Sequence, residues 1–158
     1  MVELIYNKQT EKGLIGLLFR NCAGGIVFYQ GRVLLLKNEK DEWVMPKGVI
    51  RDGHDARTVA LARVRDEAGV PARIVMNAGD TCYEFFSVTR RQPVCNRIQW
   101  FVMEGERGDC IPAAPFTQAA FFDKETALDH ITYTQDRSLL AVAWDKYDEI
   151  HDEINKEM

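Results

Sequence analysis

The stretch from Trp43 to Val70 constrains the fold more than any other part of the sequence. It predicts a short strand that ends at Pro46-Lys47-Gly48, then a loop, and then a helix over residues 55–68. Gly69 follows that helix at the place where a glycine commonly ends one. Strand, loop and helix in this order indicate a layered protein in which a helix packs against a sheet. The apolar positions that support the helix are Val59, Ala60, Val64 and Ala68.

The rest of the chain predicts further strands and two later helices. A hairpin is expected over residues 24–37, because two β-rich runs flank Tyr29-Gln30-Gly31. The pattern predicts an α/β (α+β) fold, with helices layered on a mixed sheet. The length of 158 residues fits one domain, 1–158, in which residues 1–20 form an N-terminal extension or strand. The other expected strands cover 73–76, 82–89, 97–104 and 119–122, and the later helices cover 124–130 and 136–155.

Composition excludes several classes of protein. The net charge of −4 argues against nucleic-acid binding over the whole surface. A hydrophobic content of 46% argues against disorder, and no apolar run approaches the ~20 residues of a membrane span. The first ten residues lack the features of a secretory signal, so we expect a cytoplasmic protein. The four cysteines lack zinc-binding spacing, and we expect reduced thiols, with Cys22 and Cys82 in the core.

Three charged residues share one face of the predicted helix. Arg63, Asp66 and Glu67 lie at positions i, i+3 and i+4. Two adjacent carboxylates near a glycine carbonyl form an all-oxygen site of the kind that magnesium prefers, especially with phosphate as a further ligand. The same spacing also fits a solvated helix face with an internal ion pair, so the spacing alone leaves both interpretations open.

The whole stretch from Gly48 to Val70 resembles the Nudix box, GX5EX7REUXEEXGU, in which U is an apolar residue. Asp66 and Glu67 fall on the acidic pair of that motif. The resemblance extends over roughly residues 20–147 and is nearest to diadenosine polyphosphate and diphosphoinositol-type members. It implies the Nudix fold, a mixed sheet sandwiched between helices, with residues 48–70 as its loop–helix element. The sequence departs from the motif at His54 and Arg63, where the family has glutamates, and at Ala62, where it has arginine.

This resemblance implies a pyrophosphate hydrolase with an eroded catalytic site. The substrate would be a nucleoside diphosphate linked to another moiety. The cofactor would be Mg²⁺, or Mn²⁺ in its place, bound weakly by the Gly48 carbonyl, Asp66 and Glu67. Arg63 cannot accept a proton, so the general base has to come from another residue. The candidate catalytic residues are Glu67, Asp66, His54 and Glu104, with Glu106 and Asp109 as further acids, while Gln118 stands where relatives often carry an acid.

Basic side chains are candidates for binding the phosphates of this ligand. They are Lys47, Arg63, Arg91 and Arg97. Two functions stay open: a weakly active hydrolase, and a catalytically silent module that binds a nucleotide or polyphosphate. A nucleic-acid partner is a third hypothesis that rests only on the basic turn at residues 90–91, and the net charge argues against it. No membrane partner is expected, and a homodimer is a further alternative.

Overall fold

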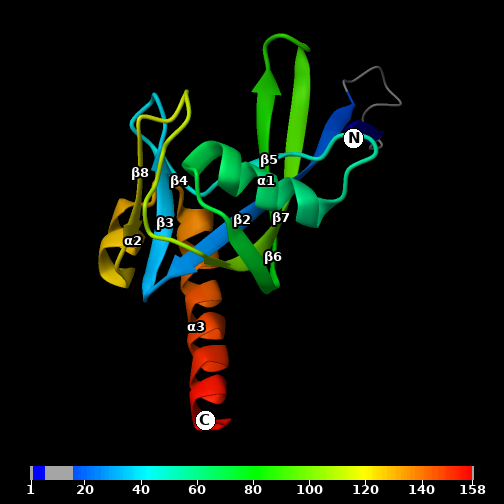
Figure 1. Ribbon diagram of the computed structural model, residues 1–158. Coiled ribbons are helices and arrows are strands. Elements are labelled where there is room, and N and C mark those ends of the chain that lie inside the picture. The colour runs from blue at the N-terminus through cyan, green and yellow to red at the C-terminus, as the bar shows by residue number, and fades with distance from the viewer. Residues whose placement is uncertain (1, 6–15, 158) are drawn as a thin grey trace.

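The computed structural model describes residues 2–5 and 16–157 of the protein, and within them eight strands form one mixed sheet (Figure 1). The main strand order is β4-β3-β2-β7-β6, with β2 and β7 parallel and their other neighbours antiparallel. β1 and β5 also pair with β2, and β8 pairs with β3. The strands are β1 Val2–Ile5, β2 Leu17–Tyr29, β3 Arg32–Lys37, β4 Trp43–Val44, β5 Lys47–Val49, β6 Ala72–Ser87, β7 Gln92–Gly105 and β8 Gln118–Phe122.

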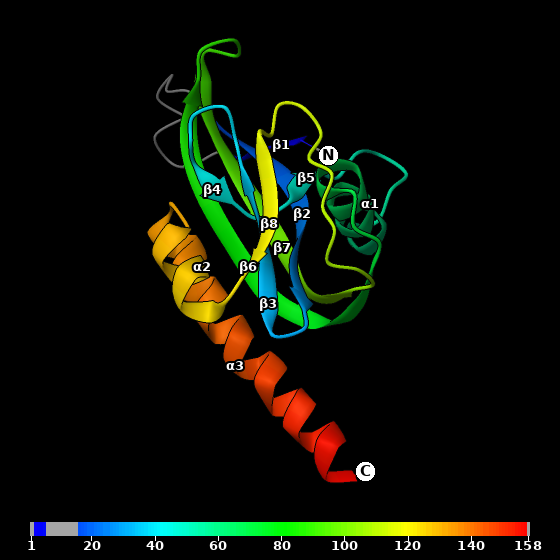
Figure 2. The same cartoon turned by 60° about the vertical axis from the view of Figure 1, so that its left-hand side comes forward.

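The helices cover both faces of this sheet. Figure 2 shows α1 (Ala56–Ala68) on one side, and α2 (Lys124–His130) and α3 (Thr134–Glu157) on the other. Side chains of β7 alternate between the two layers, because successive residues of a strand point to opposite faces. Trp100 packs in the α3-side core, whereas Phe101 packs in the α1-side core. The predicted fold class, a mixed sheet between helices, is therefore confirmed.

Capping residues at both ends determine where the helix that carries the motif begins and ends. Asp55 precedes α1, and its side chain accepts a hydrogen bond from the Thr58 backbone N–H at 2.8 Å. Gly69 ends the helix with φ of 71°, a left-handed conformation that glycine adopts without a steric penalty. The expected apolar positions of this helix are all buried. None of the helices in the described ranges is long and apolar enough to cross a membrane.

The β6–β7 hairpin differs most from the expected strands. Residues 73–76 and 82–89 were predicted as separate strands, but β6 runs continuously from Ala72 to Ser87. Irregular pairing against β7 between Ile74 and Met76, and again between Asn77 and Gly79, lets the strand continue. Gly79 has φ of 106°, which only glycine adopts easily.

The cysteine prediction was partly wrong. Cys82 and Cys95 form a disulfide between β6 and β7, and Cys82 is exposed rather than part of the core. The two residues occupy diagonal positions on paired strands, so their side chains meet although 13 residues separate them in the sequence. Cys22 is a buried free thiol, as expected, and burial raises its pKa.

Candidate functional site

A cavity of about 810 Å³ is lined by residues from the end of α1, the start of α3 and the outer part of β6. We call it the Glu67 cavity. Glu67 and Lys47 are charged residues of its lining. Its aromatic lining residues include Tyr83, Phe85 and Tyr133. The backbone carbonyl of Glu67 accepts a hydrogen bond from the Ala113 N–H at 3.0 Å, which holds the neighbouring loop of the cavity wall in place.

Glu67 is the most perturbed carboxyl of this cavity. Burial raises its pKa to about 7, because desolvation disfavours the charged form. The positive charges of Arg63 and Lys47 and a hydrogen bond from the Lys47 backbone N–H act in the opposite direction but do not cancel the effect of burial. A carboxyl that titrates near neutral pH can accept and release a proton under physiological conditions.

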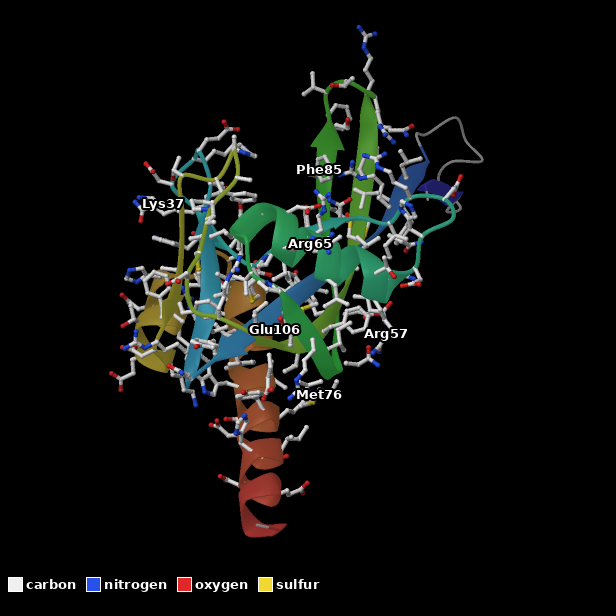
Figure 3. The ribbon with its side chains drawn as sticks, viewed as in Figure 1. Lys37, Arg57, Arg65, Met76, Phe85 and Glu106 are labelled. Atoms are coloured by element: carbon white, nitrogen blue, oxygen red, sulfur yellow. A yellow bond between two sulfur atoms is a disulfide. The ribbon has the colours of Figure 1, made fainter. Side chains whose placement is uncertain are left out.

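Asp66, the neighbour of Glu67, faces arginine side chains instead of the cavity. Its carboxylate oxygens lie 3.6 Å from Arg63 Nη2 and 3.6 Å from Arg65 Nε. Arg65 extends outward from α1 in Figure 3. The stem of Arg63 packs on Gly48, where an added Cβ would lie only 2.3 Å from Arg63 Cδ. Arg63 therefore occupies the space between the predicted metal ligands Gly48 and Asp66.

These contacts do not fit a tightly bound divalent cation. Asp66 pairs with guanidinium groups, while Glu67 belongs to the cavity and its pKa is high. In the part of the chain that the structure describes, no three His, Cys, Asp or Glu side chains come together as a metal-binding group. Magnesium prefers several oxygen ligands in near-octahedral arrangement, and Arg63 brings a positive charge to this position.

Asp136 is a second carboxyl of the same cavity, although its sequence context predicts only the start of a helix. It lies in the first turn of α3. Burial raises its pKa, and the charge of Lys47 partly opposes that rise. Lys47 thus interacts electrostatically with both Glu67 and Asp136. No local motif marks Asp136, because 69 residues separate it from Glu67 and only the tertiary fold brings them to one cavity.

The rim of the cavity is fixed by a tyrosine–carboxylate contact. The Tyr133 hydroxyl donates a short hydrogen bond to Glu42, whose carboxylate also accepts one from Asn38 at 2.9 Å. The hydrogen bond to Glu42 raises the pKa of Tyr133 to about 12, and the same bond lowers the pKa of Glu42. Tyr133 is consequently held as a neutral ring beside the cavity.

Several predicted site residues lie away from the Glu67 cavity. His54 and Arg97 line a separate cavity of about 300 Å³ beside the loop that precedes α1. Arg91 is exposed in the β6–β7 turn, with φ of 53°. The structure thus brings together Lys47, Gly48, Arg63, Asp66 and Glu67 and separates them from His54, Arg91 and Arg97.

Glu104 lies on β7 away from the predicted site, on the side opposite the β6–β7 turn. Gly24 is level with both Lys47 and Trp100, and Glu104 follows Trp100 by four residues on β7, or about 13 Å along a strand. Its carboxylate accepts a hydrogen bond from Tyr147 at 3.0 Å and pairs with Arg73 and His151. Burial works to raise the pKa of Glu104, but the Tyr147 hydrogen bond and the Arg73 charge lower it overall. Through Tyr147 and His151, Glu104 holds α3 against β7.

The sequence is similar to that of known proteins. The family model of the NUDIX domain matches residues 18–156. An RNA pyrophosphohydrolase from Dinoroseobacter shibae is 36% identical over 77 residues, which cover 46% of this chain and 48% of that protein, so the chain spans about half the length of this curated relative.

Solved structures share the fold at low sequence identity. The Ap4A hydrolase of C. elegans, solved as a binary complex, has a TM-score of 0.61 and 17% identity, covering 78% of this chain and 93% of that one. A NUDIX hydrolase from Nitrosomonas europaea has a TM-score of 0.66 and 14% identity, covering 94% and 88%. These likenesses show a shared fold. The match of the family model over residues 18–156 shows that the chain belongs to the Nudix family.

Proposed function

We propose that this protein binds a nucleoside diphosphate linked to another moiety in the Glu67 cavity and hydrolyses its pyrophosphate slowly. The observation that carries the proposal is the placement of Glu67 and Lys47 together in a cavity of about 810 Å³, and the pKa of Glu67, raised by burial, supports it. Membership of the Nudix family and the activities named for the relatives support the reaction class. The cavity volume falls within the range of small-molecule sites.

The chemistry that follows uses the residues of the cavity. Deprotonated Glu67 takes a proton from water as the water oxygen bonds to one phosphorus atom, and the bridging P–O bond breaks to release the other phosphate half. A base with a pKa near the working pH suits this role. The Lys47 ammonium, which faces Glu67, stabilises the charge that develops on the phosphoryl oxygens. The family's divalent cation would meet Arg63 where it needs oxygen ligands, so magnesium binding is weak and turnover is slow.

A catalytically silent binding module is the second candidate, and the position of Arg63 favours it. The Arg63 guanidinium lies 3.6 Å from Asp66 and packs over Gly48, so it neutralises part of the motif and offers a phosphate ligand. In this alternative the cavity binds the nucleotide, and Glu67 contributes to affinity without turnover.

A comparison of two carboxyl variants tests the proposal. Diadenosine tetraphosphate and nucleoside triphosphates are incubated with wild type, Glu67→Gln and the control Glu149→Gln, which alters an exposed carboxyl on α3. Loss of a general base lowers turnover by ~10²–10⁴ in Glu67→Gln, whereas the control keeps wild-type turnover. Nucleotide binding by calorimetry without any turnover in wild type, unaffected by a chelator, would favour the silent module instead.

A further inference from the structure

The β6–β7 hairpin projects beyond the rest of the sheet, at the end of the molecule opposite the C-terminus of α3 (Figure 1). A disulfide between Cys82 and Cys95 joins its two strands. In the part of the chain that the structure describes, β7 is the only strand that pairs with β6. The outer side chains of β6 are largely exposed, with Phe85 at 38% and Phe86 at 59%. A hairpin with few buried side chains is only marginally stable in water, so the disulfide helps to keep the outer part of β6 on β7.

The disulfide and a hydrogen-bonded pair of side chains lie on opposite faces of the same part of the hairpin. Tyr83 follows Cys82 on β6 and Asn96 follows Cys95 on β7, and strand register places Tyr83 directly opposite Asn96. Successive residues of a strand point to opposite faces, so these two side chains lie on the face away from the disulfide. Asn96 Nδ2 donates a hydrogen bond to the Tyr83 hydroxyl at 2.6 Å. Breaking the disulfide therefore removes a covalent constraint from the backbone that positions Tyr83.

Tyr83 belongs to the wall of the Glu67 cavity. It lines the cavity together with Phe85, and the two rings stack with centroids 6.1 Å apart. Phe85 projects from β6 in Figure 3, and the Arg20 guanidinium lies 5.6 Å from its ring centroid. Arg20 Nε also donates a hydrogen bond to Asn96 Oδ1 at 2.8 Å. The disulfide is thus connected, through neighbouring residues of the hairpin, to the aromatic wall of the proposed binding site.

The cysteines of the chain differ in how open they are to reaction. Cys82 is an exposed residue, whereas Cys95 is only 1% exposed, so a thiol from solution approaches the disulfide from the Cys82 side. Burial raises the pKa of the free Cys22 thiol, and burial together with the charge of Asp109 raises the pKa of the free Cys110 thiol. The thiolate is the nucleophile in disulfide exchange, so these two cysteines are poor attackers. Exchange of the disulfide therefore depends on an external thiol.

We propose that Cys82 is a site of thiol–disulfide exchange with a dithiol reductant, and that the Cys82–Cys95 bond regulates ligand affinity at the Glu67 cavity. This inference rests on the proposed function and adds a form of regulation to its site. A disulfide that only stabilises the fold is the competing explanation. The position of an exposed cysteine next to a tyrosine of the cavity wall favours regulation, because the reacting sulfur and the binding site then share one short segment of β6.

The exchange proceeds in two steps that balance. A thiolate of the reductant attacks Cys82 Sγ, the S–S bond breaks, and Cys95 leaves as a thiolate that takes up a proton. The second thiol of the reductant loses its proton and attacks the reductant sulfur of the mixed disulfide, and Cys82 leaves and is protonated in turn. Two electrons and two protons pass to the protein, so the reductant becomes a disulfide and both cysteines become thiols.

The test compares oxidised and reduced wild type, with dithiothreitol as the dithiol and diadenosine tetraphosphate as the ligand probe. Alkylation and mass spectrometry count the free thiols, and circular dichroism verifies that both forms are folded. Calorimetry with a chelator present then measures the dissociation constant of the probe. Reduction should weaken binding by about 2- to 10-fold, which corresponds to the ~0.5–1.5 kcal/mol of one positioned aromatic contact. Reoxidation should restore the original affinity.

Two variants separate the disulfide from the other thiols. The double variant Cys82→Ser/Cys95→Ser should bind the probe as weakly as reduced wild type does, and the reductant should not change its affinity. Cys110→Ser removes a free thiol that lines a different cavity, so it should respond to the reductant as wild type does. If the double variant does not fold, the reduced wild type decides the question, because its folding is verified on the sample that is titrated.

Two outcomes would overturn the inference. One is an equal dissociation constant for the oxidised and the reduced protein, which would make the disulfide a structural bond only. The other is a disulfide that dithiothreitol reduces only at urea concentrations that unfold the protein. Absence of probe binding in both states would overturn the proposed function together with its regulation, whereas binding that the reductant does not change would overturn the regulation alone.

Discussion

Replacing Glu67 by glutamine should stabilise the protein, and the gain should depend on pH. The carboxyl is buried, so its ionised form is disfavoured and its pKa rises from an ordinary 4.5 to about 7. The folded state therefore holds this proton more tightly than the unfolded chain does. Stability is highest at low pH, falls as the pH rises above about 4.5, and the loss is complete above about 7. Glutamine has nearly the shape of the protonated acid and no charge to bury.

The size of this effect follows from the two pKa values. One pKa unit corresponds to about 1.4 kcal/mol, so the shift of Glu67 corresponds to about 3 kcal/mol. Most of this penalty develops between pH 5 and pH 8. The free energy of unfolding of Glu67→Gln, relative to wild type, should accordingly increase by about 2–3 kcal/mol over that interval.

Urea denaturation at pH 5, 6, 7 and 8 measures the difference directly. Glu149→Gln is the control, because its exposed side chain on α3 gives no desolvation penalty to relieve. A difference between Glu67→Gln and wild type that stays constant over this range, or that shrinks as the pH rises, would refute the desolvation argument and with it the assignment of Glu67 as a base.

Three further substitutions test separate parts of the structure. Arg63→Glu removes the side chain that packs on Gly48 and adds an oxygen ligand. Calorimetry should detect tighter Mg²⁺ binding, and pyrophosphate hydrolysis should be faster. Unchanged Mg²⁺ affinity would count against the idea that Arg63 weakens metal binding. Cys82→Ser should lower stability by about 3 kcal/mol in urea, as should a reductant acting on wild type, and insensitivity to both would exclude the disulfide. Tyr147→Phe keeps the ring but loses the hydroxyl that donates to Glu104, so we expect a loss of about 1 kcal/mol, with no loss meaning that this hydrogen bond does not help to hold α3.

The fold was largely predictable, because its elements leave strong local patterns. The spacing of apolar residues located α1 to within one residue, and Gly69 marked its end. The hairpin at Gln30-Gly31 joins β2 and β3 as expected, and both residues have positive φ. The length of β6 was not predictable from its pattern, since Asn77 to Asp80 has the composition of a turn and only pairing with β7 keeps it extended.

The site was predictable only where the motif is contiguous. Sequence spacing put Asp66 and Glu67 next to each other, but adjacent helical residues differ in direction by about 100°. Only the tertiary structure distinguishes Glu67, which enters the cavity, from Asp66, which faces Arg63. The sequence could not place Asp136 at the site, because Asp136 lines the cavity only through the position of the first turn of α3.

The position of Glu104 depends on strand register. Its position on a strand after the motif made it a candidate base, but strand register places it about 13 Å from the level of Lys47. The disulfide was not predicted for a similar reason: a spacing of 13 residues does not indicate a disulfide until β6 and β7 are known to pair. Register between distant strands is therefore the information that local patterns lack.

The pH dependence of kcat/KM for pyrophosphate hydrolysis tests whether Glu67 is the general base. If Glu67 is the base, kcat/KM of wild type should rise with an apparent pKa near 7 and level off above it, and this titration should be absent from the residual activity of Glu67→Gln. A profile that is flat between pH 6 and pH 8, or one that persists unchanged in Glu67→Gln, would exclude Glu67 as the base.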